Sequence, residues 1–167
     1  LKDVGGFVGG LLKEGKRKTK NVSWRSLITL DADHANKEIL STLELLYGCA
    51  FVAYSTRSSS PENLRLRLVI PLARPVLPDE YPAVSRRIAA DLGMDCFDDT
   101  THETARLMYW PSCSSDSEYL FHVSDDPWLD PDGILAGYVD WRDPYYWPEA
   151  SKAKAERKKA ITDKQSD

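Results

Sequence analysis

Residues 27–33 constrain the fold more than any other stretch of the sequence. The apolar and β-branched run of residues 27–30 ends at Asp31, and Asp33 follows after a single alanine. β-Branched residues favour extended backbone, and side chains two residues apart on a strand point to the same face. The pattern therefore predicts a buried strand whose end carries Asp31 and Asp33 side by side.

This pair of carboxylates has two interpretations. No basic residue stands beside Asp31 or Asp33 in the sequence, and close carboxylates are costly unless a divalent cation neutralises them. Mg²⁺ takes one or two protein carboxylates together with substrate phosphates, which points to phosphoryl or nucleotidyl transfer. The alternative is a strand followed by an aspartate-rich turn, because aspartate also favours turns and helix N-caps.

Length and cysteine content limit the class of protein. A chain of 167 residues can form one domain with a core, or one domain and an appendage. No apolar run approaches the length of a membrane span and nothing at the start resembles a signal peptide, so we expect no membrane contact. The three cysteines match no zinc or disulfide spacing, which predicts a reducing, cytoplasmic compartment.

Charge is distributed unevenly along the chain. Net charge is −4, yet residues 13–25 hold six basic residues against one acidic, and residues 151–161 hold five against one. Basic segments beside an acidic body suit phosphate contact near a carboxylate cluster, although solvated surface is the alternative. Within the first segment we expect a basic loop, a candidate DNA contact or simply a solubilising loop, at Lys16, Arg17, Lys18 and Lys20.

A second strand is predicted over residues 64–72, where leucines and an isoleucine alternate with Arg65 and Arg67. We expect Pro71, Pro75 and Pro78 to end this strand and to form a stiff connection. Two arginines on one strand face need anionic partners. They could pair with structural carboxylates, or hold a triphosphate through forked hydrogen bonds.

The remaining pattern predicts an α/β (α+β) fold with mixed or antiparallel strands covered by helices. Helices are expected over residues 36–47 and 81–92, and further strands over 1–12 (as a strand or hairpin), 49–55, 105–111 and 119–123. The aromatic residues after position 124 either pin an irregular segment onto the core or stack on bases. The interpretation divides the chain into a domain at 1–148 and a basic helical tail or linker at 149–167.

Together these motifs resemble the archaeo-eukaryotic primase superfamily, in particular the primase-polymerase domain of phage and mobile-element replication proteins. The resemblance covers about residues 2–121 and is carried by residues 2–10, 30–34, 54–56, 61–72 and 97–112. It implies a catalytic core with an RRM-like sheet and an N-terminal α/β unit packed beside it.

The resemblance also implies roles for individual residues. Asp31, Asp33 and Asp98 would be the catalytic acids and would hold Mg²⁺ or Mn²⁺, with Asp99 as a substitute for Asp98. The implied nucleotide-binding residues are Ser55, Arg57, Arg65, Arg67 and Arg106. The reaction would transfer a nucleotide from a nucleoside triphosphate (NTP or dNTP) to a 3′ hydroxyl on a single-stranded DNA template. The implied partner is a helicase domain or subunit after the tail, and the implied location is the cytoplasm of a bacterial host cell.

One family feature is absent. Relatives carry a histidine after the second core strand, in a Ser-x-His setting, whereas this chain has Arg57 and Ser59 in that loop. Arginine could keep a phosphate contact but stays protonated, so it cannot transfer a proton. The resemblance favours an enzyme. Two alternatives stay open, namely a catalytically impaired domain acting as a DNA-binding or replication adaptor, and a metal-dependent nuclease.

Overall fold

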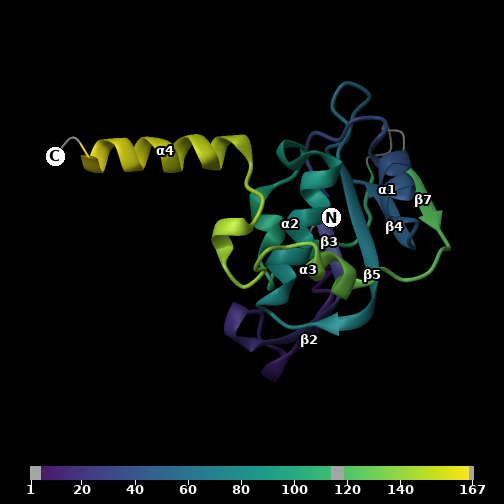
Figure 1. Ribbon diagram of the computed structural model, residues 1–167. Coiled ribbons are helices and arrows are strands. Elements are labelled where there is room, and N and C mark those ends of the chain that lie inside the picture. Colours follow the sequence, from purple (N-terminus) through teal and green to yellow (C-terminus); the bar gives the residue numbers. More distant parts are fainter. Residues whose placement is uncertain (1–4, 114–118, 166–167) are drawn as a thin grey trace.

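The computed structural model describes residues 5–113 and 119–165 of the chain (Figure 1). Its centre is a five-stranded sheet in which every neighbouring pair of strands is antiparallel. The strand order is β2 (Gly10–Leu12), β3 (Val22–Ala32), β5 (Leu66–Val76), β4 (Phe51–Ser55) and β7 (Phe121–Ser124). Two short strands, β1 (Gly6–Phe7) and β6 (Met108–Tyr109), pair with each other outside this sheet.

Within the described residues, four α-helices and several short 3₁₀ turns complete the fold. The helices are α1 (Ile39–Tyr47), α2 (Glu80–Gly93), α3 (Pro131–Ala136) and α4 (Ser151–Gln165). The 3₁₀ turns are η2 (Lys13–Gly15), η3 (Thr19–Asn21), η4 (Met94–Cys96), η5 (Asp99–His102) and η6 (Pro144–Tyr146). The helices predicted over 36–47 and 81–92 are confirmed, and the first begins three residues later than expected.

The period of two along the strands separates a core face from an open face. The core face carries Leu30, Leu68 and Ala53, which are fully buried and pack with Leu43 of α1 and Ile88 of α2. The opposite face carries a cross-strand row that runs over four strands, made of Asp31, Arg67, Tyr54 and Phe121. The acid at the end of β3 therefore lies on the face that the helices leave open.

The N-terminal strands do not pair with each other. β1 pairs with β6 and β2 pairs with β3, so the segment forms strands, as one of the two predicted alternatives has it, and the hairpin alternative is wrong. Residues 1–4 lie outside the described residues. Gly9 lies so close to β3 that an added Cβ would be 2.7 Å from the Cβ of Leu27. Its carbonyl accepts hydrogen bonds from the backbone N–H groups of Ser26 and Leu27. The glycine is required by close approach of two backbones.

Two prolines lie inside β5 instead of ending it. Pro71 and Pro75 belong to the strand, so the predicted boundary is wrong. The reason lies in the neighbouring strand, because β4 pairs with β5 only as far as Val69. Beyond that residue one edge of β5 is free of β4, and proline is tolerated where no ladder hydrogen bond is required.

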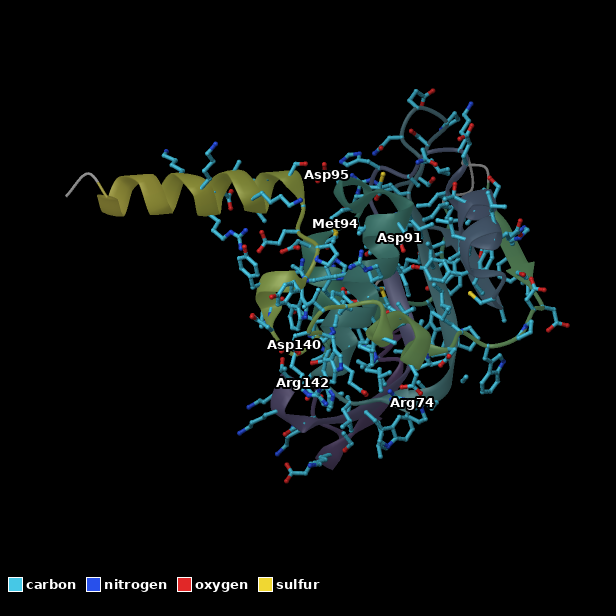
Figure 2. All side chains as sticks on the ribbon, in the orientation of Figure 1. Arg74, Asp91, Met94, Asp95, Asp140 and Arg142 are labelled. Carbon is cyan, nitrogen blue, oxygen red and sulfur yellow. The ribbon has the colours of Figure 1, made fainter. Side chains whose placement is uncertain are left out.

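The C-terminal third is attached to the core by aromatic and polar contacts. Trp141 and Trp147 are half-buried against the core, as predicted for this segment, whereas Trp128 is exposed. α4 projects from the body (Figure 1), and the described part of its surface is polar. Its first residue, Ser151, is held by Asp95, which accepts from its N–H at 2.7 Å and its hydroxyl at 2.6 Å (Figure 2).

A buried histidine makes the stability of the fold depend on pH. His102 in η5 is 3% exposed, and its Nδ1 lies 3.0 Å from Ser85 Oγ. Burial, helped by the charge of Arg86, lowers the pKa of His102 from 6.5 to about 4. Between these two values the unfolded chain binds a proton that the folded chain does not, so acid destabilises the fold.

We therefore expect the free energy of unfolding to fall as the pH drops from 6.5 to about 4, with His102 contributing on the order of 3 kcal/mol. Urea unfolding at a series of pH values measures this slope. The His102→Gln variant serves as the control and should show a shallower slope over the same window. An unchanged slope in this variant would contradict the assignment.

Candidate functional site

The register of β3 against β5 brings acids and arginines face to face. Asp31 lies opposite Arg67, and the distance from Arg67 Nη2 to Asp31 Oδ2 is 3.4 Å. Just beyond the strand end, Arg65 Nη1 lies 3.2 Å from Asp33 Oδ1. Both predicted pairs thus lie on the open face, and each arginine contacts one carboxylate.

The third acid arrives from a distant part of the chain. Phe97 forms an isolated β-bridge with Ala32, and the backbone N–H of Asp98 donates to the carbonyl of Asp31 at 2.9 Å. The Asp98 side chain caps η5 by accepting from Thr100 N–H. Arg106 Nη2 lies 2.7 Å from Asp98 Oδ2 and 4.0 Å from Asp31 Oδ2, so one guanidinium group lies between two acids.

These groups line a single pocket of about 300 Å³. Its charged lining consists of Asp31, Asp33, Asp98, Arg57, Arg65, Arg67 and Arg106. Thr56, Ser58, Tyr109 and Ser112 complete the wall. The pocket thus combines carboxylate oxygens, which suit a divalent cation, with guanidinium groups, which suit phosphate.

The environment of Asp31 raises the pKa of its carboxyl. Desolvation by burial raises the pKa of its carboxyl, the charge of Asp33 raises it further, and Arg67 opposes both effects. The net direction is upward, so the folded protein carries an electrostatic cost to keep Asp31 ionised. Such a cost is typical of a functional site, where a ligand of opposite charge relieves it.

The donor set fits Mg²⁺ or Mn²⁺ in kind, since all three acids offer hard oxygen ligands. As the side chains lie, however, no group of three or more acidic, histidine or cysteine residues within 5–113 and 119–165 is placed to hold a metal ion. Each acid instead contacts an arginine. A cation would bind to Asp31, Asp33 and Asp98 only as these guanidinium groups move away.

Ser55 lies away from the acids. It occupies the core-face position next to Tyr54, and its hydroxyl accepts from the backbone N–H of Leu120 at 3.0 Å. This contact holds the chain before β7 against β4. Ser59 is also buried, and its hydroxyl accepts from the N–H of Arg65. Arg57, by contrast, is exposed at the pocket. Nucleotide binding by Ser55 stays a prediction without a contact to the pocket.

One residue of the basic loop, Arg17, lies near the acids of the pocket. Arg17 lines a smaller cavity together with Asp31, Arg67 and Arg106, and its guanidinium donates to the carbonyl of Ala105 at 3.3 Å. The other predicted DNA contacts, Lys16, Lys18 and Lys20, are exposed. Their exposure is compatible with the predicted DNA contact, which stays a prediction.

Two tyrosines of the site were not anticipated from the sequence. Tyr54 donates from its hydroxyl to the carbonyl of Tyr109 at 3.0 Å, and Arg67 Nη1 donates to the same carbonyl at 3.0 Å. These contacts orient Arg67 towards Asp31. The two-residue period of β4 places Tyr54 on the open face, which was a usable signal, whereas the position of Tyr109 depends on the pairing of β6 with β1.

Comparison with known proteins places the chain in a family. Residues 1–150 match the sequence profile of the VapE N-terminal domain. The chain belongs to this family. No curated protein sequence matches this VapE N-terminal domain significantly.

A solved structure shares the fold of this VapE N-terminal domain. It is the AEP domain of the cyanophage S-2L primase-polymerase (PrimPol), with a TM-score of 0.57 and 17% sequence identity. The match covers 78% of this chain and 68% of the other. The predicted fold class, a mixed α+β fold of the primase-polymerase type with an antiparallel sheet, is therefore confirmed. Among the described helices, none is long and apolar enough to cross a membrane.

Proposed function

We propose that this VapE N-terminal domain is a DNA-directed nucleotidyltransferase, a primase or polymerase, of a phage or mobile-element replication protein. One observation carries the proposal, namely that three acids and four arginines from separate segments line one pocket. A nucleoside triphosphate bound with a divalent cation needs both kinds of group. The primase-polymerase fold of the cyanophage protein supports the same reaction class.

The arrangement of charges suggests how the site works. In the free protein the arginines neutralise the acids, at 3.2 Å for Arg65 and 3.4 Å for Arg67. When a triphosphate enters, its oxygens take over the guanidinium groups by forked hydrogen bonds. Asp31, Asp33 and Asp98 then become available to hold Mg²⁺ or Mn²⁺. The cation, when bound, promotes attack by the 3′ hydroxyl and neutralises the departing pyrophosphate.

The tail completes the proposed organisation. We assign the chemistry to residues 1–148 and treat residues 149–167 as a basic helical connector. A helix whose described surface is polar and that projects from the body suits a spacer between domains. By analogy with phage and mobile-element replication proteins, the partner would be a helicase domain or subunit in the cytoplasm of the bacterial host.

The test is nucleotide incorporation on a primed and an unprimed single-stranded template, with Mn²⁺ or Mg²⁺ and labelled dNTPs or NTPs. We expect metal-dependent extension or initiation by the unaltered protein. Absence of incorporation under all these conditions, with DNA binding retained, would favour the adaptor. Cleavage of a single-stranded oligonucleotide without any nucleotide would favour the nuclease.

Restoring a histidine separates a silent domain from an active one. Arg57 is the position to change, because it is exposed at the pocket, whereas Ser59 is buried and holds the N–H of Arg65. Incorporation that appears only in Arg57→His would show that this version is naturally impaired. Ser59→His is the matched control and should not restore it.

A further inference from the structure

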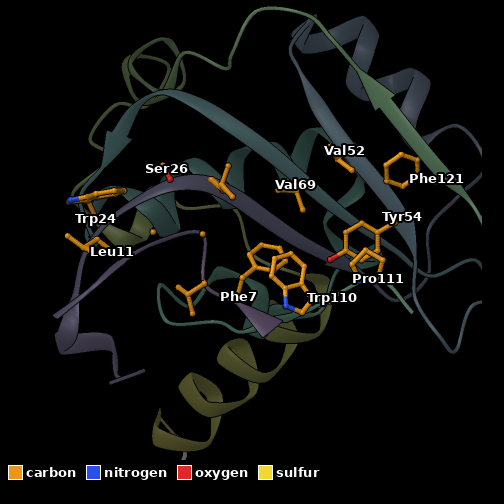
Figure 3. Close-up of a pocket in the computed structure, with 14 residues that line it drawn as sticks. Phe7, Leu11, Trp24, Ser26, Val52, Tyr54, Val69, Trp110, Pro111 and Phe121 are labelled. Carbon is orange, nitrogen blue, oxygen red and sulfur yellow. The ribbon is translucent and has the colours of Figure 1, made fainter. Parts of the chain in front are cut away.

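The open face of the sheet carries an apolar groove of about 570 Å³ outside the charged pocket (Figure 3). Five aromatic side chains line it: Phe7, Trp24, Tyr54, Trp110 and Phe121. None of the described residues that line the groove is charged. They come from all five strands of the sheet, from β1 and from the residues that follow β6, so the groove is a product of tertiary structure.

Two of the aromatic side chains of this groove are largely exposed to solvent. Trp110 is 50% exposed and Phe121 is 57% exposed. Phe7 and Trp110 pack against each other with ring centroids 4.9 Å apart, which leaves one broad apolar surface. Contiguous exposed apolar surface of this kind marks a binding site on a folded protein, because leaving it in water is costly.

The groove lies next to the charged pocket. Tyr54 lies in the same cross-strand row as Arg67 and Asp31, and Phe121 extends that row to the edge of the sheet. The carbonyl of Tyr109 accepts from both Tyr54 and Arg67, so these side chains form the wall between the two cavities. A chain of nucleotides with a phosphate at the arginines can therefore reach the aromatic rings with its bases.

The other end of the groove adjoins the basic loop. Leu11 and Trp24 lie opposite each other on β2 and β3, and the loop with Lys13 and Lys16 connects these two strands. Cations thus lie at both ends of an uncharged aromatic surface. Single-stranded nucleic acid requires this combination, since cations follow the phosphates and aromatic side chains stack on the bases.

We propose that this groove binds the unpaired bases of single-stranded DNA, by stacking on Trp110 and Phe121. That the bound nucleic acid is DNA rests on the proposed function. A peptide fits less well, because the groove offers no charged partner, and the two flanking sets of cations match a polyanion.

The test compares two fluorescein-labelled oligomers of equal length, one of deoxythymidine and one of abasic sites, by anisotropy without metal or nucleotide. Both carry the same phosphates, and only the first carries bases. We expect the thymidine oligomer to bind more tightly, and Trp110→Ala and Phe121→Ala each to weaken it about 10-fold. Neither variant should change the affinity for the abasic oligomer.

Two controls keep the result interpretable. Trp128→Ala removes a 64% exposed tryptophan that lies outside the groove, and it should leave both affinities unchanged. Arg17→Ala should weaken both oligomers alike, since its expected contact is phosphate. Phe121 lies on the exposed edge strand β7, so its variant keeps the test valid if Trp110→Ala fails to fold.

Equal affinity for the two oligomers, or equal weakening of both by the groove variants, would overturn the inference. Different results would refute the proposed function and the groove assignment. Base-dependent binding through the groove without nucleotide incorporation refutes the polymerase and leaves the groove assignment intact. Incorporation with base-independent binding refutes only the groove assignment.

Discussion

Replacing Asp31 by asparagine is expected to reduce nucleotide incorporation by on the order of a thousand-fold. Asp31 lies at the centre of the charged pocket, 3.4 Å from Arg67 and 4.0 Å from Arg106. The amide removes an anionic oxygen ligand, so the proposed cation loses a large part of its site. Steady-state incorporation on a primed template measures the loss.

The same substitution should leave the fold as stable as before or more stable. Desolvation raises the pKa of Asp31, so at neutral pH its ionised form is less favourable in the folded than in the unfolded chain. Asparagine removes this cost, as is common when a functional charge is deleted. Thermal unfolding of both proteins checks the direction. A marked fall in Tm would instead indicate that Asp31 is a structural partner of the arginines.

Glu80 supplies the matched control. Its carboxylate accepts from Arg74 at 2.9 and 3.0 Å and from the backbone N–H of Leu77 at 2.7 Å. The hydrogen bonds from Arg74 lower the pKa of Glu80, so its ionised form stabilises the fold at neutral pH. Glu80→Gln should therefore lower the Tm and retain incorporation. Asp31→Asn should lose incorporation and keep its Tm, whereas Glu80→Gln should keep incorporation and lose Tm. This contrast would distinguish a catalytic carboxylate from a structural one.

Replacing Arg25 by methionine is expected to lower the free energy of unfolding by about 3 kcal/mol and the Tm by about 10 °C. Arg25 belongs to the basic segment 13–25 but is fully buried, and it forms no ion pair among the described residues. Its guanidinium donates to the carbonyls of Gly9, Thr104 and Leu27 and to Thr29 Oγ1, and lies 4.2 Å from the ring centroid of Tyr81.

These bonds hold separate segments together. They join the turn between β1 and β2 and the segment before Arg106 to β3. Methionine fills much of the same volume but leaves the Thr104 carbonyl without its Arg25 donor, and a buried unsatisfied group costs about 1–3 kcal/mol. Urea unfolding and thermal unfolding measure the change.

Arg142, labelled in Figure 2, is the comparison for Arg25. Its guanidinium also lies over an aromatic ring, 4.3 Å from the ring centroid of Trp141. It is exposed, so Arg142→Met should change the free energy of unfolding by less than about 0.5 kcal/mol. Equal effects of the two substitutions would show that the buried hydrogen bonds of Arg25 contribute little.

The local spacing of residues in the sequence determined the helices and strands of this protein. The period of two in residues 64–72 predicted that Arg65 and Arg67 share a face opposite the leucines. In the structure both arginines line the charged pocket, whereas Leu66 and Leu68 are buried in the core. The helices predicted from apolar spacing end at Gly48 and Gly93, both with positive φ. Such features follow from backbone geometry over a few residues, so sequence spacing is sufficient to predict them.

Only the tertiary structure decided how these elements combine into a site. The bridge between Ala32 and Phe97 brings Asp98 to Asp31, and the register of β3 against β5 gives each acid an arginine. The burial of Arg25, the continuation of β5 through Pro71 and the aromatic groove depend equally on the order of strands in the sheet. Spacing along a chain specifies the direction of a side chain but not its distant neighbour, because that neighbour is set by strand order, register and chain path.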